Sequence, residues 1–267
     1  MGNWRVEDEL HTDLEGVRRV VVKIVAGDVT VTAGPTSHID VRRESGSDVD
    51  VQLIDGTLNV LQPDSNMAPL ERFIKWFTEG RRHTCTVELT APADASIDIV
   101  TVSAPVVVSG FRNGTRVKTV SGDVTLSTLG DRVDVKTVSG EVQAKSINGD
   151  VALKSVSGDL SIVDGACPTV AAKTVSGEVL LDLDLDPTGT YDVKTVSGAV
   201  SVRTKSEPNL SVDAKTVSGR VISDVGENWE PSAGSRNFSD TIGDGGARLH
   251  VKTVSGDLRI VEGRAAA

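Results

Sequence analysis

Apolar and polar side chains alternate along most of this chain, with Val, Ile, Leu or Thr at every second position of many short stretches. Alternation with a period of two is typical of β-strands that have one buried face. Residues 39–42, 49–53 and 57–61 are clear examples, and each should have one face in water. The pattern therefore predicts an all-β protein.

The strands are separated by a pentapeptide, Lys-Thr-Val-Ser-Gly, that recurs at nearly constant intervals. Complete copies begin at Lys118, Lys136, Lys173, Lys194, Lys215 and Lys252, and near copies begin at Lys145 and Lys154. Steps between neighbouring copies are 18 residues from 118 to 136, 19 from 154 to 173, and 21 from 173 to 194. A period of this kind predicts a repeat architecture.

One repeat is too short for a pair of helices, but two strands of about six residues at roughly 3.3 Å per residue, with two turns, fill it. The Lys145 copy lies 9 residues from Lys136 and 9 from Lys154, so we expect it at the opposite corner of a rung. The sequence thus predicts a single-stranded β-solenoid, or β-helix, of about 18–21 residues per rung, with an N-terminal β cap and one short helical insert.

The pentapeptide also predicts where each rung bends. Val117 and Val120 cannot both point inward from a straight strand, because side chains alternate between its two faces. We therefore expect a corner after Thr119, with both valines buried and Lys118 exposed. Glycines should occupy the corner, because the missing Cβ permits tight backbone geometry. The predicted corner residues are Gly122, Gly140, Gly158, Gly177, Gly198, Gly219 and Gly256.

We expect one elongated domain, 1–267, because the repeats cover most of the chain. Its predicted parts are cap strands at 1–65, a helical insert at 66–83, regular rungs at 84–223, a loop or degenerate rung at 224–246 and a final rung at 247–263. Within the cap, residues 20–31 resemble a degenerate rung, with Lys23 and Gly27 in the positions of Lys118 and Gly122.

Residues 66–83 interrupt the strand pattern with the features of an amphipathic helix. Pro69 can begin the helix, Gly80 can end it, and apolar side chains recur on one face. The helix could contact an anionic membrane surface or a partner, or it could cover a sheet edge or the open end of the solenoid. The candidate contact residues are Leu70, Arg72, Phe73, Lys75, Trp76, Phe77, Arg81 and Arg82. In the 224–246 segment, Trp229 and Phe238 are candidate loop contacts.

Composition narrows the functional classes. The net charge of -10 argues against nucleic-acid binding, and 3 % aromatic residues suit a narrow interior of stacked aliphatic side chains. Cys85 and Cys167 lie far apart, and the four histidines share no motif, so we expect no metal site, cofactor or catalytic residue. We expect no secretory signal and no membrane span, and hence a cytoplasmic protein.

Stacked rungs should place the pentapeptide lysines in one basic column, with an acidic column just beyond the corner that includes Asp123, Glu141, Asp159, Glu178 and Asp257. The two columns could compensate each other, or they could bind a repetitive charged ligand. The threonines of the pentapeptide should point inward and form hydrogen bonds along the stack.

Several runs resemble a known bacterial family: Val25-Ala-Gly-Asp-Val29, Thr86-Val-Glu-Leu-Thr-Ala-Pro92, the repeated pentapeptide followed by Asp or Glu and Val, and Ile242-Gly-Asp-Gly-Gly246. The family comprises β-strand-repeat proteins of unknown function, labelled putative adhesins and also called Toastrack domains. The resemblance implies a β-solenoid, often joined to membrane segments in envelope-stress systems, that senses ligands or assembles proteins. It implies no catalytic residues.

The residues and the resemblance together favour a non-enzymatic scaffold or ligand-sensing, protein-interaction module. A second hypothesis is a peripheral membrane or cationic-peptide binding protein of an envelope-stress response, and a third is a self-assembling structural protein. The expected partner is another protein or a second copy, with an anionic membrane surface as an alternative.

Overall fold

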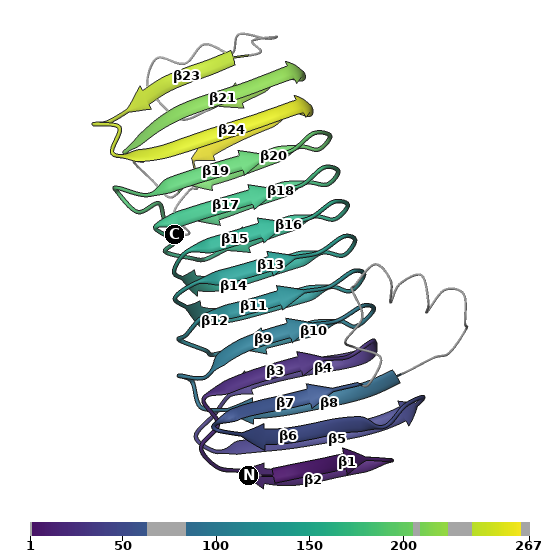
Figure 1. Cartoon of the computed structure of the whole chain (residues 1–267). Coiled ribbons are helices and arrows are strands. Elements are labelled where there is room, and N and C mark those ends of the chain that lie inside the picture. The colour runs from purple at the N-terminus through teal and green to yellow at the C-terminus, as the bar shows by residue number, and fades with distance from the viewer. Residues whose placement is uncertain (1, 63–83, 205–208, 224–236, 263–267) are drawn as a thin grey trace. The chain divides into compact units, whose positions relative to one another are not determined.

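The computed structural model describes residues 2–62, 84–204, 209–223 and 237–262 (Figure 1). Over these ranges the chain forms strands and turns and no helix. The expected helical insert at 66–83 lies outside the described residues. Contacts divide the chain into two compact units, 1–140 and 141–267.

The first unit consists of antiparallel cap strands followed by parallel rungs. Its strands are β1 (Gly2–Val6), β2 (Glu9–Leu14), β3 (Arg19–Lys23), β4 (Ala26–Ala33), β5 (Ser37–Ser45), β6 (Val49–Ile54), β7 (Thr57–Leu61), β8 (Thr84–Ala91), β9 (Ser96–Val100), β10 (Val106–Ser109), β11 (Thr115–Lys118), β12 (Val124–Gly130) and β13 (Val133–Lys136). One sheet has the order β1-β6-β7-β3-β9-β11-β13, and the other has β2-β5-β8-β4-β10-β12. The pairs β1–β6, β6–β7, β2–β5 and β5–β8 are antiparallel.

The second unit is built almost entirely from parallel rungs. Its strands are β14 (Val142–Asn148), β15 (Val151–Lys154), β16 (Leu160–Val163), β17 (Thr169–Lys173), β18 (Val179–Leu183), β19 (Thr190–Lys194), β20 (Val200–Thr204), β21 (Leu210–Ser218), β22 (Val221–Ser223), β23 (Asn237–Ile242), β24 (Ala247–Ser255) and β25 (Leu258–Glu262). The two sheets have the orders β15-β17-β19-β24-β21-β23 and β14-β16-β18-β20-β25-β22. Among the described strands of this unit, β23 alone runs antiparallel to its neighbour, which is β21.

The strand register confirms the β-solenoid and its repeat. Lys118 pairs with Lys136 in the first unit, so equivalent positions of successive repeats stack directly. The degenerate rung in the cap has the predicted register, because Lys23 pairs with Val100, which pairs with Lys118. Inward columns of Val, Ile, Leu and Ala are buried in both units and form the core between the sheets.

The predicted burial of the pentapeptide valines is wrong. Val138, Val156, Val196 and Val254 are each 47–49 % exposed, whereas the residues before them are buried: Thr137, Ser155, Thr195 and Thr253. The alternation of the strand continues through the valine, so Thr points inward, Val points outward, and the chain bends only at the Ser-Gly that follows. The corner therefore lies one residue later than the hydrophobic pattern indicated.

At six of the predicted corner glycines an added Cβ would lie 1.9–2.4 Å from a backbone carbonyl oxygen of the neighbouring rung: Gly122, Gly140, Gly177, Gly198, Gly219 and Gly256. A Cβ added to Gly198 would lie 1.9 Å from the carbonyl oxygen of Gly177 on the neighbouring rung, and one added to Gly122 would lie 2.2 Å from that of Ala104. Gly140 and Gly177 also have φ values of 147° and 149°. Both the contact and, at these two positions, the backbone conformation disfavour larger residues.

The rung that is last in the chain is not last in the stack. Strand β24 pairs with β19 on one side and with β21 on the other (Figure 1). Strand β25 pairs likewise with β20 and β22. In the sequence β21 and β22 follow β20, but in the stack they lie one rung further on. Strands β24 and β25 occupy the rung between them and the rung of β19 and β20. Residues 237–242, predicted as part of a loop or degenerate rung, form the antiparallel strand β23.

Candidate functional site

A column of exposed valines crosses the second unit. Five successive rungs contribute one valine each, and these side chains are between 47 and 61 % exposed. In spatial order the column comprises Val156, Val175, Val196, Val254 and Val217. Neighbouring strands lie about 4.8 Å apart, so the valines form one continuous apolar surface. We call this column and the lysine column beside it the valine–lysine strip.

The lysine column lies two residues before the valines on the same rungs. Register pairs connect Lys154, Lys173, Lys194, Lys252 and Lys215 in that order. Lys194 Nζ lies 2.7 Å from Asp192 Oδ2, and Lys215 Nζ lies 3.2 Å from Asp213 Oδ1. These partners are two residues earlier on the same strand, rather than in the acidic column that was expected to compensate the lysines.

The acidic residues beyond the corner bind backbone of the neighbouring rung instead. Asp159 Oδ1 accepts a hydrogen bond from the Glu178 amide at 2.7 Å, and Asp257 Oδ1 accepts one from the Arg220 amide at 3.0 Å. Arg220 Nη2 also lies 3.2 Å from Asp257 Oδ2. The Arg220 amide and then its side chain lower the pKa of Asp257, despite some desolvation. These carboxylates therefore connect neighbouring rungs through hydrogen bonds.

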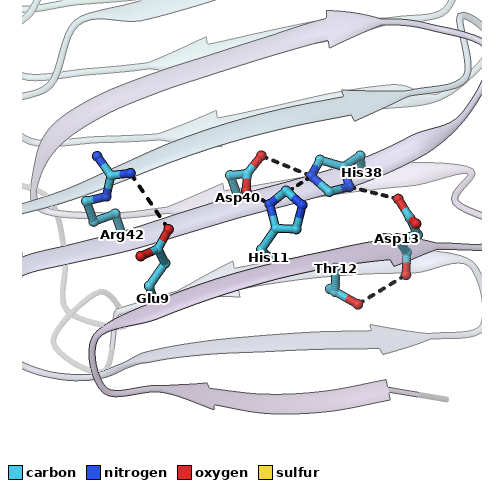
Figure 2. A network of polar contacts seen from close by, with 7 residues as sticks. All are labelled: Glu9, His11, Thr12, Asp13, His38, Asp40 and Arg42. Carbon is cyan, nitrogen blue, oxygen red and sulfur yellow. Dashed lines mark hydrogen bonds and ion pairs between the residues drawn. The ribbon is translucent and has the colours of Figure 1, made fainter.

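A polar cluster lies on the outer face of the first unit (Figure 2). Strands β2 and β5 pair antiparallel, which places His11 opposite Asp40 and Asp13 opposite His38. His38 Nδ1 lies 2.8 Å from Asp13 Oδ1, and His38 Nε2 lies 3.0 Å from Asp40 Oδ2 and 3.3 Å from His11 Nδ1. His11 Nδ1 also contacts Asp40 Oδ1. We call His11, Asp13, His38 and Asp40 the His–Asp cluster.

Electrostatics within the His–Asp cluster favour charged side chains. The hydrogen bond to Asp13, with the charge of Asp40, raises the pKa of His38 above its ordinary value. Desolvation raises the pKa of Asp40, but contacts with His11 and His38 outweigh it and hold that pKa below the usual value. By contrast, burial raises the pKa of Cys85 to about 12 and that of Cys167 to about 11, so both thiols stay protonated.

The sequence did not indicate the His–Asp cluster. Histidines 11 and 38 are separated by 27 positions, and only the pairing of β2 with β5 brings them together. The one available signal was the spacing His11-x-Asp13 and His38-x-Asp40, which puts each pair on one face of its strand.

Most of the predicted contact residues lie outside the described residues. These are Trp229 and all the candidates of the 66–83 segment, from Leu70 to Arg82. Phe238 lies on β23, opposite Ala214, and is half-buried. Among the described residues no helix is long and apolar enough to cross a membrane.

Solved structures with the same fold cover nearly the whole chain. One, a putative adhesin from Bacteroides fragilis, is 12 % identical over 95 % of this chain and 97 % of its own, with a TM-score of 0.50. Another, a putative lipid binding protein from Parabacteroides distasonis, is 12 % identical over 97 % of this chain and 98 % of its own, with a TM-score of 0.53. At this identity the likeness shows the fold alone.

No curated protein sequence matches the chain. The family model for Toastrack DUF4097, however, matches residues 17–261. That match begins just before the degenerate rung of β3 and β4 and ends within β25, so it includes every parallel rung of both units. The repeat, the fold and this match agree: the chain belongs to the Toastrack DUF4097 family.

Proposed function

We propose that this protein is a non-enzymatic scaffold or ligand-sensing module that binds a partner protein along the valine–lysine strip. The observation that carries the proposal is the column of five exposed valines in register. Contiguous exposed apolar surface on a protein marks an interaction site more often than isolated apolar residues do. The strip also repeats one chemical unit per rung, as a scaffold for an extended partner requires.

The charge beside the valines specifies the partner. Lys154, Lys173 and Lys252 make no ion pair with any described residue. A partner segment that combines apolar and acidic side chains would cover the valines and pair with these lysines. Such a segment is the occupant we propose.

A second candidate function is peripheral binding to an anionic membrane, through the same strip or the 66–83 segment. One solved structure of the same fold is described as a putative lipid binding protein, which favours this candidate.

We propose that the protein is cytoplasmic. Its two buried, unpaired thiols support this localisation.

The test compares three proteins: the intact chain, a strip variant with Val175→Thr, Val196→Thr and Val254→Thr, and a control with Leu180→Thr and Ile222→Thr. Threonine keeps the β-branched shape and removes apolar surface. The control residues are also exposed, at 37 % each, but belong to the other sheet. A photo-crosslinking residue at position 217 captures partners in cells, and sedimentation with anionic and neutral vesicles measures membrane binding.

We expect one dominant crosslinked protein that the strip variant loses and the control keeps, while both variants retain their circular dichroism spectrum. Salt-sensitive sedimentation with anionic vesicles, lost in the strip variant, would replace this proposal by the membrane candidate. Crosslinks between copies, with concentration-dependent light scattering, would favour self-assembly. Equal crosslinking by all three proteins would refute a role for the strip.

A further inference from the structure

The His–Asp cluster has no role in the proposed binding of a partner, and its atoms have the arrangement of metal ligands. We propose that it binds a divalent transition-metal ion of the Zn²⁺ type. The ligands are His11 Nδ1, His38 Nε2 and a carboxylate oxygen of Asp40, which all lie within 4.8 Å of one another (Figure 2).

Distances between the ligand atoms fit one ion. Zn²⁺ binds nitrogen and oxygen ligands at about 2.0–2.2 Å, so two ligands of a tetrahedral site are separated by about 3.3 Å. His38 Nε2 lies 3.3 Å from His11 Nδ1 and 3.0 Å from Asp40 Oδ2. Small side-chain rotations that separate His11 from Asp40 would open the third edge of the site.

Asp13 holds His38 in the form that a metal ligand requires. His38 Nδ1 lies 2.8 Å from Asp13 Oδ1, and because a carboxylate can only accept, the hydrogen bond requires the proton on Nδ1. In the neutral ring the lone pair is then on Nε2, the atom that faces His11 and Asp40. A carboxylate that accepts the other ring proton is the usual support of a metal-binding histidine.

The strands place these side chains before any ion binds. Strand β5 is paired with β2 on one side and with β8 on the other, so the backbone of His38 and Asp40 is held in the middle of a sheet. Glu88 on β8 lies opposite Asp40 and adds negative charge beside the site. His11 is exposed, which leaves room for a water molecule as the fourth ligand.

The choice of metal follows from the donor atoms. Imidazole nitrogen with one carboxylate suits Zn²⁺, Cu²⁺ and Ni²⁺, whereas Mg²⁺ and Ca²⁺ prefer oxygen ligands throughout. The competing account is that the histidines are protonated and form only ion pairs with Asp13 and Asp40. In that case the cluster would have no selective affinity for transition metals.

Titration calorimetry of the full chain without an affinity tag, first freed of metal with a chelator, separates these accounts. Zn²⁺ is added to the unaltered protein, to His38→Ala, to Asp40→Asn and to Asp13→Asn. His250→Ala is the matched control, since His250 Nδ1 lies 3.2 Å from Asp213 Oδ2 but belongs to no group of three candidate ligands among the described residues. Circular dichroism verifies that each variant is folded, and visible absorption of Co²⁺ reports the ligand geometry.

We expect one Zn²⁺ per chain, no saturable binding by His38→Ala or Asp40→Asn, and unchanged binding by His250→Ala. Asp13→Asn should weaken binding by about tenfold, because Asp13 only orients a ligand. Should His38→Ala fail to fold, zinc-dependent shifts of the His11 and His38 ring signals in the unaltered protein decide the question. Absence of Zn²⁺ binding by that protein, or equal binding by Asp40→Asn, would overturn the proposal.

Discussion

Adjacent residues of one pentapeptide have opposite environments. Thr174 and Thr195 are buried, at 5 % exposure, while the more apolar Val175 and Val196 are about half exposed. The strand continues to alternate until the glycine allows the bend, so backbone geometry and not hydrophobicity decides which side chain points inward. Thr101 Oγ1 donates a hydrogen bond to Thr119 Oγ1 at 2.9 Å along the stack. The hydroxyls of Thr137, Thr195 and Thr253 have no partner among the described residues, so the expected column of threonine hydrogen bonds is not continuous.

Replacing a corner glycine should destabilise the protein through a steric clash alone. In Gly198→Ala the new Cβ would lie 1.9 Å from Gly177 O, so the rungs must separate locally. We expect a loss of about 1–3 kcal/mol in the free energy of unfolding, measured by denaturant titration. Gly114→Ala, whose Cβ would meet nothing closer than 3.7 Å, should change it by less than about 0.5 kcal/mol. Equal effects at the two positions would contradict this account.

The carboxylate of Asp257 should make stability depend on pH in the acid range. Its folded pKa is lowered, first by the Arg220 amide, so its contribution is present above the unfolded pKa of about 3.9 and is lost as pH falls through the folded pKa. Asp257→Asn should therefore be less stable than the unaltered protein at pH 6 by about 1 kcal/mol. The difference should shrink below about pH 4 in thermal melts.

The Arg220 side chain provides the control for this titration. Since the backbone amide is the largest cause of the lowered pKa, Arg220→Ala should keep much of the shift in an NMR titration of Asp257. A pKa for Asp257 that returns fully to its ordinary value in Arg220→Ala would assign the effect to the guanidinium instead.

At the scale of elements, the order of the strands in the sheets of the second unit differs from their order in the sequence. Strand β24 forms eight register pairs with β21 and five with β19, although β20, β21, β22 and β23 come between β19 and β24 in the sequence. The lysines of all three strands are in register, so each strand is a suitable neighbour for either of the others. The chain therefore closes this end by inserting its last rung and adding the antiparallel β23.

The inserted rung should be more protected from hydrogen exchange than its position in the chain implies. Amides of β24 are paired on both sides, whereas β23 is paired with β21 alone among the described strands. We expect amides of β24 to exchange as slowly as those of β17 and more slowly than those of β23, measured by mass spectrometry of peptides. Equally fast exchange in β24 and β23 would place the last rung at a frayed end.

At the scale of the whole molecule, the chain is a series of near-equivalent rungs. Each rung contacts its immediate neighbours, so stability should be close to a sum of terms for rungs and their interfaces. The contacts group these rungs into the units 1–140 and 141–267. The single elongated domain expected from the repeat stays a prediction.

A whole rung should therefore be removable. Deleting 174–194 joins Lys173 to Thr195 and restores the pentapeptide, so β17 can pair with β24 in the register that β19 uses. We expect a folded protein with a lower melting temperature, measured by circular dichroism. Deleting only 174–183 removes β18 and leaves β19 to follow β17 directly, which should prevent folding of the second unit. Two equally unfolded variants would contradict the repeat model.

The sequence alone determined the β-solenoid, its rung length, its strands and the register of its lysine column, because a periodic pattern puts equivalent residues at equivalent positions. The tertiary structure decided the rest. Near-identical copies of the pentapeptide cannot specify which rungs are neighbours, so the insertion of β24 depended on the folded chain. The position of the bend turned Val175 outward, and the antiparallel pairing of β2 with β5, outside the repeat, brought His11 to His38. A repeat can be recognised in the sequence itself, because each copy contains the same residues. Contacts between distant segments outside the repeat are seen only in the folded structure.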